Sequence, residues 1–170
     1  MKQKYKYHWL NKNGFMQIDF AFAVLIFFLF FITISGLYNS EISNQKKILE
    51  ISELEITARD ICEIIIKTSG VPMDWENDIN SIKMIGLKNI ENNSLNVNKV
   101  NKFNNTYYSN FIQNTLPKEF IYYITITNLK DNLVKGNIGY EPKTNSKIGV
   151  FNCYSNYGGN KVRVGVKVWK

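Results

Sequence analysis

One carboxylate lies where an ionisable side chain is costly. Asp19 comes just before residues 20–38, a run of 19 residues without a charged side chain. A lone carboxylate at the centre of a membrane span costs about 2.5–3.5 kcal/mol, and less near the bilayer surface, so it is usually paired or functional. The alternative is an interfacial acid at the edge of a plain anchor.

Two other sets of residues indicate covalent chemistry outside the cytoplasm. Cys62 and Cys153 are compatible with one disulfide in an oxidising compartment, or with two unrelated buried thiols. Sequons for N-glycosylation begin at Asn92 and at Asn104, although such triplets arise easily by chance in an Asn-rich sequence.

The sequence contains no recognisable catalytic or cofactor site. The single histidine, His8, precedes the apolar run, so the rest of the chain has no histidine for a Ser-His-Asp arrangement. One His and two widely spaced Cys make no metal-ligand cluster, and phosphate-loop and dinucleotide motifs are absent. We therefore expect no enzymatic activity, no metal and no cofactor.

The apolar run itself predicts a helix in a lipid bilayer. Its 19 residues rise roughly 28 Å as a helix, close to the thickness of the hydrocarbon core. Four lysines precede it, within a net charge of +7, and basic residues beside a first membrane helix hold that end in the cytoplasm. We read these lysines as a topology signal and expect no nucleic-acid partner.

The expected organisation has four parts: a basic leader (1–14), a transmembrane helix (15–38), its amphipathic continuation (39–68) and an exterior head (69–170). The continuation is predicted from apolar residues at helical spacing. These are Ile51, Leu54, Ala58, Ile61, Cys62 and Ile65. Gly70 and Pro72 end this helix, because glycine caps helices and proline cannot continue them.

The head is expected to be mainly an antiparallel sheet with a small helical insertion. Residues 81–87 predict a short strand, and Asn96 caps a helix predicted over 97–114. Further strands are predicted from residue 120, over 133–140, over 147–154 and after the turn at 158–160. In the last strand, alternate valines from Val162 to Val168 face a core, while the residues between them, with Trp169, face the other way. The fold class is therefore α+β, with a long N-terminal helix.

The N-terminal residues resemble the signal of type IV prepilins. The match comprises a basic leader ending at Gly14, Phe15 as the first mature residue, Asp19 as the fifth, and the apolar helix. The resemblance implies that a prepilin peptidase cleaves after Gly14 and that the helices then bundle with other pilin-like subunits at an assembly platform. Asp19 would pair with the new Phe15 amine of a neighbouring subunit and fix its register. The fifth mature residue is more usually Glu, whose side chain is longer.

The remainder is similar to pilin-like surface proteins of archaea such as methanogens. The similar segments are residues 69–76, 85–87, 95–96 with 99–100, and the alternating strand that ends in Trp169. The leading hypothesis is a structural pilin-like subunit at the cell surface, with its N-terminus cytoplasmic and its head outside. One alternative is an unprocessed single-span protein presenting a binding or adhesion domain. Another is a membrane-tethered accessory factor of a secretion or motility machine.

Overall fold

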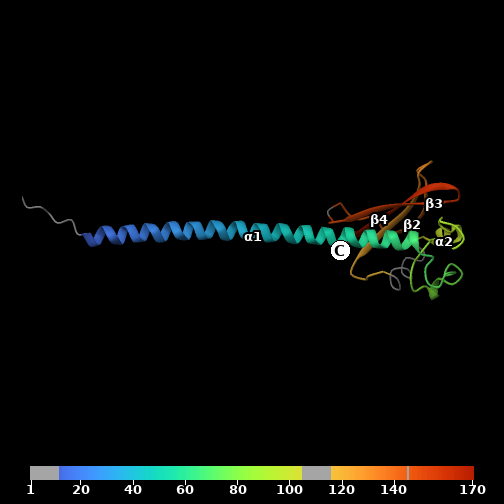
Figure 1. The fold of residues 1–170 in the computed structure, drawn as a ribbon, viewed down its shortest axis with the longest axis horizontal. Helices are drawn as coiled ribbons and strands as arrows, with labels where there is room; N and C mark the ends of the chain where they lie inside the picture. The colour runs from blue at the N-terminus through green and yellow to red at the C-terminus, as the bar shows by residue number, and fades with distance from the viewer. Residues whose placement is uncertain (1–11, 105–115, 145) are drawn as a thin grey trace, which may run out of the picture. The chain divides into compact units, whose positions relative to one another are not determined.

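The computed structural model describes residues 12–104, 116–144 and 146–170 (Figure 1). The chain divides into two units, Met1–Lys47 and Ile48–Lys170, and helix α1 contributes to both. The elements in order are α1 (Lys12–Lys67), a 3-10 helix (Ile79–Ser81), α2 (Val97–Lys102), β1 (Ile121–Asn128), β2 (Val134–Gly139), β3 (Gly149–Tyr157) and β4 (Asn160–Trp169).

Helix α1 begins at Lys12, three residues before the predicted start of the transmembrane helix. Nothing between residues 12 and 15 prevents a helix, since a glycine inside a helix costs only about 1 kcal/mol relative to alanine. The helix also continues through Gly36 and on to Lys67. One uninterrupted helix therefore carries both the apolar run and the amphipathic stretch.

The four strands form one antiparallel sheet in the order β2-β1-β4-β3. In the register, Ile124 on β1 lies opposite Val166 on β4, and Phe151 on β3 lies opposite Val166 from the other side. The valines of β4 from Val162 to Val168 are fully buried, as their alternation predicted. Trp169 departs from that pattern, because it is only 7% exposed at the end of the strand.

The core of the second unit lies between the C-terminal part of α1 and the sheet (Figure 1). Leu54, Ala58, Ile61, Cys62 and Ile65 are buried there, which confirms most of the predicted apolar stripe. Ile51, at the start of that stripe, remains 39% exposed. The predicted α+β fold, with its long helix, antiparallel sheet and small helical insertion, is confirmed.

Close backbone approach fixes two glycines in this unit. Gly149 begins β3 against α1, where an added Cβ would lie 2.3 Å from the carbonyl carbon of Leu54. Gly70 follows α1 with a φ of +85°, a conformation that suits glycine as a helix cap. A Cβ on Gly70 would also meet the ring of Trp75 at 2.6 Å. The predicted helix end is thus confirmed.

Two predicted elements of the head are wrong. Residues 81–87 form no strand, because only Met84 pairs, in an isolated bridge with Val71. The buried positions Ile82, Ile85 and Leu87 do not alternate, so the segment packs as irregular chain.

The predicted helix over 97–114 ends much earlier, at Lys102. Asn96 caps it as expected, and its side chain accepts hydrogen bonds from the backbone N–H groups of Asn98 and Lys99. Phe103 ends the helix and is fully buried. The surrounding asparagines have low helix propensity, which favours this early end. Residues 105–114 of the predicted helix lie outside the described residues.

Candidate functional site

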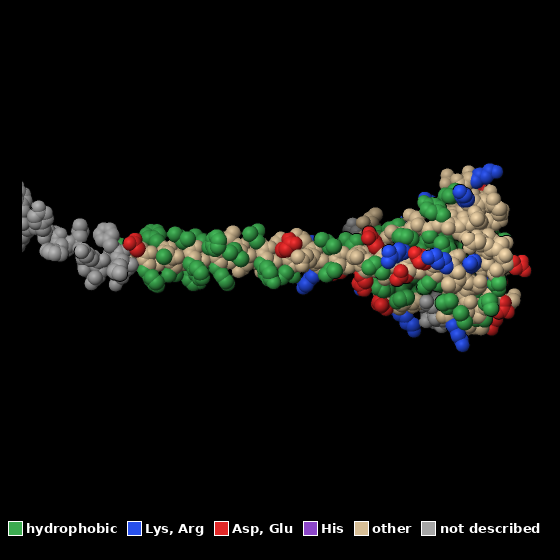
Figure 2. All heavy atoms as spheres, viewed as in Figure 1, with side chains coloured by type: hydrophobic (Ala, Val, Ile, Leu, Met, Phe, Trp, Pro, Cys, Tyr) green, Lys and Arg blue, Asp and Glu red, His purple; other side chains and the backbone are tan. Residues whose placement is uncertain are grey.

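The N-terminal part of α1 carries large apolar side chains that the chain itself leaves uncovered. Their exposed fractions between residues 18 and 38 range from 50% for Ile34 to 72% for Phe20. Figure 2 shows hydrophobic side chains gathered along this part of the helix. These residues are Ile18, Phe20, Phe22, Leu25, Ile26, Phe27, Phe28, Leu29, Phe30, Phe31, Ile32, Ile34, Leu37 and Tyr38. An exposed apolar surface of this extent indicates contact with lipid or with other helices.

This part of α1 is long and apolar enough to cross a membrane, judged by its length and composition. That finding is compatible with the predicted membrane anchor, because roughly 20 apolar residues span the hydrocarbon core as a helix. The Thr33 hydroxyl donates a hydrogen bond to the carbonyl oxygen of Leu29 one turn earlier. The Thr33 hydroxyl is thus satisfied within the helix.

The residues of the predicted processing and assembly site lie at the start of α1. Gly14 and Phe15 belong to its first turn, and Asp19 is exposed one turn after Phe15. Residues four apart share one face of a helix, and helical side chains lean toward the N-terminus. Asp19 therefore lies on the same face of α1 as Phe15, one turn further along the helix.

The two cysteines connect the other end of α1 to the sheet. Cys62 on α1 and Cys153 on β3 form a disulfide with an S–S distance of 2.00 Å. Among the described residues there is no free cysteine. Of the two alternatives left open by the sequence, the structure contains the disulfide.

Two exposed ion pairs also join α1 to the head. Lys147 donates a hydrogen bond to the carboxylate of Glu50, and Lys170 lies 3.0 Å from the carboxylate of Glu53. The hydrogen bond and the charge of Lys147 lower the pKa of Glu50 below its ordinary value. These pairs are exposed, so each contributes little to stability, but both place lysines of the head against α1.

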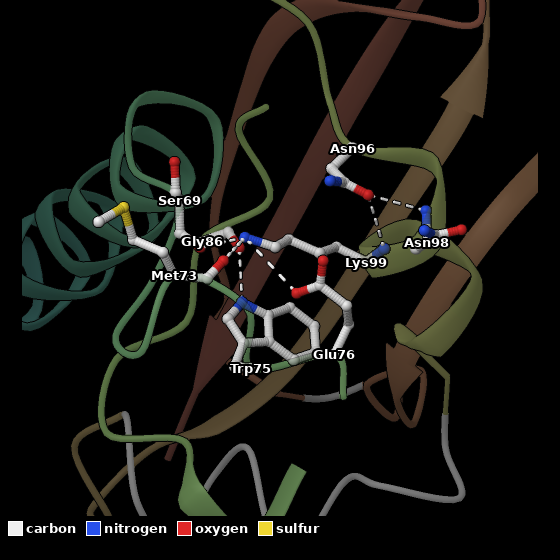
Figure 3. Close-up of polar contacts among 8 residues, drawn as sticks. All are labelled: Ser69, Met73, Trp75, Glu76, Gly86, Asn96, Asn98 and Lys99. Atoms are coloured by element: carbon white, nitrogen blue, oxygen red, sulfur yellow. Dashed lines mark hydrogen bonds and ion pairs between the residues drawn. The ribbon is translucent and has the colours of Figure 1, made fainter. Parts of the chain in front are cut away.

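A buried lysine connects α2 to the segment after α1. Lys99 is 1% exposed, and its ammonium donates hydrogen bonds to the carbonyl oxygens of Ser69, at 2.6 Å, and of Met73 (Figure 3). The same Nζ lies 3.7 Å from a carboxylate oxygen of Glu76 and 5.8 Å from the ring centre of Trp75. The Trp75 indole N–H in turn donates to the carbonyl oxygen of Gly86 at 2.9 Å.

The electrostatics of this cluster indicate a structural role. Burial lowers the pKa of Lys99 below its ordinary value, and the charge of Glu76 partly offsets that effect. The Oε2 atom of Glu76 is buried without a hydrogen bond among the described residues, so the ion pair is its compensation. Because the buried lysine binds carbonyl groups of the segment after α1, and Trp75 of that segment binds Gly86, the cluster fastens three chain segments together. The sequence gave no sign that Lys99 is buried.

The two sequons differ in their surroundings. Asn92 is exposed in the loop before α2, whereas Asn104 is half-buried just after α2. Thr106, which completes the second sequon, lies outside the described residues. No group of three or more His, Cys, Asp or Glu side chains placed to hold a metal ion occurs in the part of the chain that the structure describes.

None of the protein-family models, curated proteins or solved structures compared with this chain matches it. The functional argument therefore depends on the residues and geometry of the chain itself.

Proposed function

We propose that this chain is the precursor of a type IV pilin-like structural subunit. In this proposal a prepilin peptidase cleaves after Gly14, the apolar part of α1 anchors the mature chain in the bilayer, and the head is displayed outside the cell. On contact with an assembly platform, the same helices leave the lipid and bundle with those of other pilin-like subunits.

One observation carries the proposal. A single helix, α1, combines an exposed apolar segment starting near Asp19 with a far end that is disulfide-bonded to a folded sheet. The apolar side chains require lipid or other helices, because exposing them to water would cost about 25 cal/mol for each Å² of apolar surface. The disulfide supports an oxidising exterior for the head, since such bonds are rare in the cytosol.

The start of α1 also suits processing. The first four N–H groups of a helix lack partners within the helix, and Gly14 weakens the first turn further. This turn can therefore open at low cost and present the bond between Gly14 and Phe15 in an extended form.

The deciding experiment is the intact mass and N-terminal sequence of the protein purified from its native membrane. We expect a chain that begins at Phe15. A chain that keeps residues 1–14 would overturn the processing proposal and favour an unprocessed anchor that presents a binding domain.

A variant at the cleavage site tests the same proposal independently. Gly14→Leu introduces a branched side chain next to the bond, and we expect the leader to stay attached. Gly36→Leu is the matched control, because it changes the other glycine of α1 far from the bond. Normal maturation of Gly14→Leu would contradict cleavage at this position.

A further inference from the structure

The first sequon lies at the tip of a small loop between residues 88 and 95. An isolated antiparallel bridge joins Lys88 to Leu95, and the Asn89 N–H donates to the carbonyl oxygen of Ser94 at 2.8 Å. The Asn89 side chain accepts a hydrogen bond from the N–H of Glu91 at 3.2 Å. These contacts fix the conformation of the loop and place Asn92 at its tip.

The base of this loop is fixed in the head. Leu95 is buried, and its N–H donates to the carbonyl oxygen of Asn156 on β3 at 2.7 Å. The N–H of Asn96 donates to the carbonyl oxygen of Leu87, also at 2.7 Å. The two ends of the loop are therefore held by the folded head, and Asn92 at the tip is accessible to solvent without any unfolding of the head.

The Asn92 side chain is arranged as a glycan acceptor would need to be. Its amide oxygen accepts a hydrogen bond from the hydroxyl of Ser94, which is the third residue of the sequon. Asn92 is exposed, and its hydrogen bond with Ser94 engages the amide oxygen rather than Nδ2. The amide nitrogen that would receive a sugar is thus accessible, while the oxygen is held by the hydroxyl that the sequon requires.

Asn104 offers the opposite arrangement. It is half-buried, and its Nδ2 donates a hydrogen bond to the carbonyl oxygen of Asn101 at 3.3 Å. Glycosylation there would have to break this contact and move the side chain outward. The two triplets look equivalent in the sequence, and the structure distinguishes them.

We propose that Asn92 is an N-glycosylation site of the exterior head and that it is used in preference to Asn104. The donor class is an oligosaccharide linked through phosphate or diphosphate to a membrane lipid, and a transferase supplies the base. Asn92 Nδ2 forms a bond to the sugar C1 and loses one proton, while the bond from C1 to the phosphate oxygen breaks and the lipid phosphate leaves. The proposal rests on the exterior placement of the head, because such transferases act outside the cytoplasm.

The test uses full-length protein from the native membrane, cleaved with trypsin and measured by mass spectrometry. The two sequons fall on separate peptides, 89–99 and 103–118. We expect peptide 89–99 to carry added mass that releases sugar fragment ions, with a higher occupied fraction than peptide 103–118. An unmodified 89–99 peptide, or higher occupancy of 103–118, would overturn the proposal.

Variants of the tip give a second measurement. Asn92→Gln and Ser94→Ala should each reduce the intact mass by one glycan, whereas Ser94→Thr should keep the glycan. Asn93→Gln is the matched control, because it changes the neighbouring exposed asparagine and leaves the sequon complete. A glycan that persists on Asn92→Gln would contradict the assignment.

The same digest separates this proposal from the proposed function. An N-terminal peptide starting at Phe15 together with an unmodified 89–99 peptide would overturn only the glycosylation site. A glycosylated chain that keeps its leader would overturn only the processing.

Discussion

Cys62 on α1 is bonded to Cys153 on β3, 91 residues later in the sequence. A cross-link that closes so long a loop restricts the unfolded chain, by about 4–5 kcal/mol in the chain-entropy description. The link also lies within the core that α1 shares with the sheet. Any force transmitted along α1 therefore reaches β3 directly through this cross-link, as well as through the backbone and through packing.

Loss of this disulfide should destabilise the head. We expect Cys153→Ser to lower the free energy of unfolding by about 2–5 kcal/mol. The measurement is urea unfolding in detergent, followed by the fluorescence of the buried Trp75 and Trp169. Reduction should shift the gel mobility of the wild type and leave that of Cys153→Ser unchanged. Two free thiols in the native protein would rule the bond out.

The contact between β3 and α1 should not tolerate a side chain at Gly149. Gly149→Ala would place a Cβ 2.3 Å from the Leu54 backbone, so we expect a loss of about 1–3 kcal/mol or more from overpacking. Gly36→Ala is the matched control, because nothing lies within 4 Å of an added Cβ there. Equal unfolding midpoints for the two variants would contradict the close approach.

The Lys99 cluster should behave as a buried ion pair. Lys99→Met leaves the Glu76 charge without its partner, so we expect a loss of about 3–5 kcal/mol in the free energy of unfolding. Lys99→Met combined with Glu76→Gln should lose less, because no unpaired charge remains. Lys83→Met, at an exposed lysine in the neighbouring loop, should change stability by less than about 0.5 kcal/mol. A double variant as unstable as Lys99→Met would argue against the pairing.

The lowered pKa of Lys99 predicts how this contribution varies with pH. The folded state holds the lysine proton less tightly than the unfolded chain, whose ordinary pKa is 10.5. Between the lowered pKa and 10.5 the unfolded state binds more protons, so stability from this site rises with pH. We expect the stability difference between the wild type and Lys99→Met to widen as the pH increases toward 10.5. If this stability difference narrowed over the same pH range, the pKa of Lys99 would be raised in the folded state and not lowered.

Asp19 should matter for assembly more than for anchoring. Asp19→Ala removes the carboxylate, and we expect leader removal and membrane insertion to remain normal. The share of the chain found in filaments should fall roughly ten- to hundredfold, because a hydrogen bond to a charged group contributes about 1.5–3 kcal/mol. Asp19→Asn, with similar size and no charge, should fail likewise, while Asp19→Glu should retain assembly. The measurement compares sheared filaments with membranes. Normal incorporation of Asp19→Ala would contradict the pairing role.

The parts of the fold that the sequence predicted well depend on strict periodicity. The valines of β4 alternate without interruption, and each of them is buried as expected. The apolar positions of α1 recur at helical spacing and meet the sheet. In both cases the order of apolar and polar residues within the element is enough to identify it, because one face of each element must be apolar.

The features that sequence reasoning missed depend on distant contacts. Lys99 is buried because it meets carbonyl groups of Ser69 and Met73, 30 and 26 residues earlier, and no local pattern encodes that encounter. Residues 81–87 contain a short apolar run, which periodicity cannot assign to a strand or to irregular packing. The pairing of Cys62 with Cys153 was undecided for the same reason, since two cysteines 91 residues apart reveal their distance only in the folded chain.

The position of β4 determines when the head can fold. β4 is the latest of the four strands in the sequence, yet it lies between β1 and β3 and is hydrogen-bonded to both. Until residues 160–169 have been synthesised, β3 has no strand to pair with. The β1–β2 hairpin then lacks β4, the strand that joins it to β3. If the head is exported as proposed, an N-terminal helix that reaches the export machinery before residues 160–169 are made would deliver a head that is still unfolded and able to pass through a narrow channel.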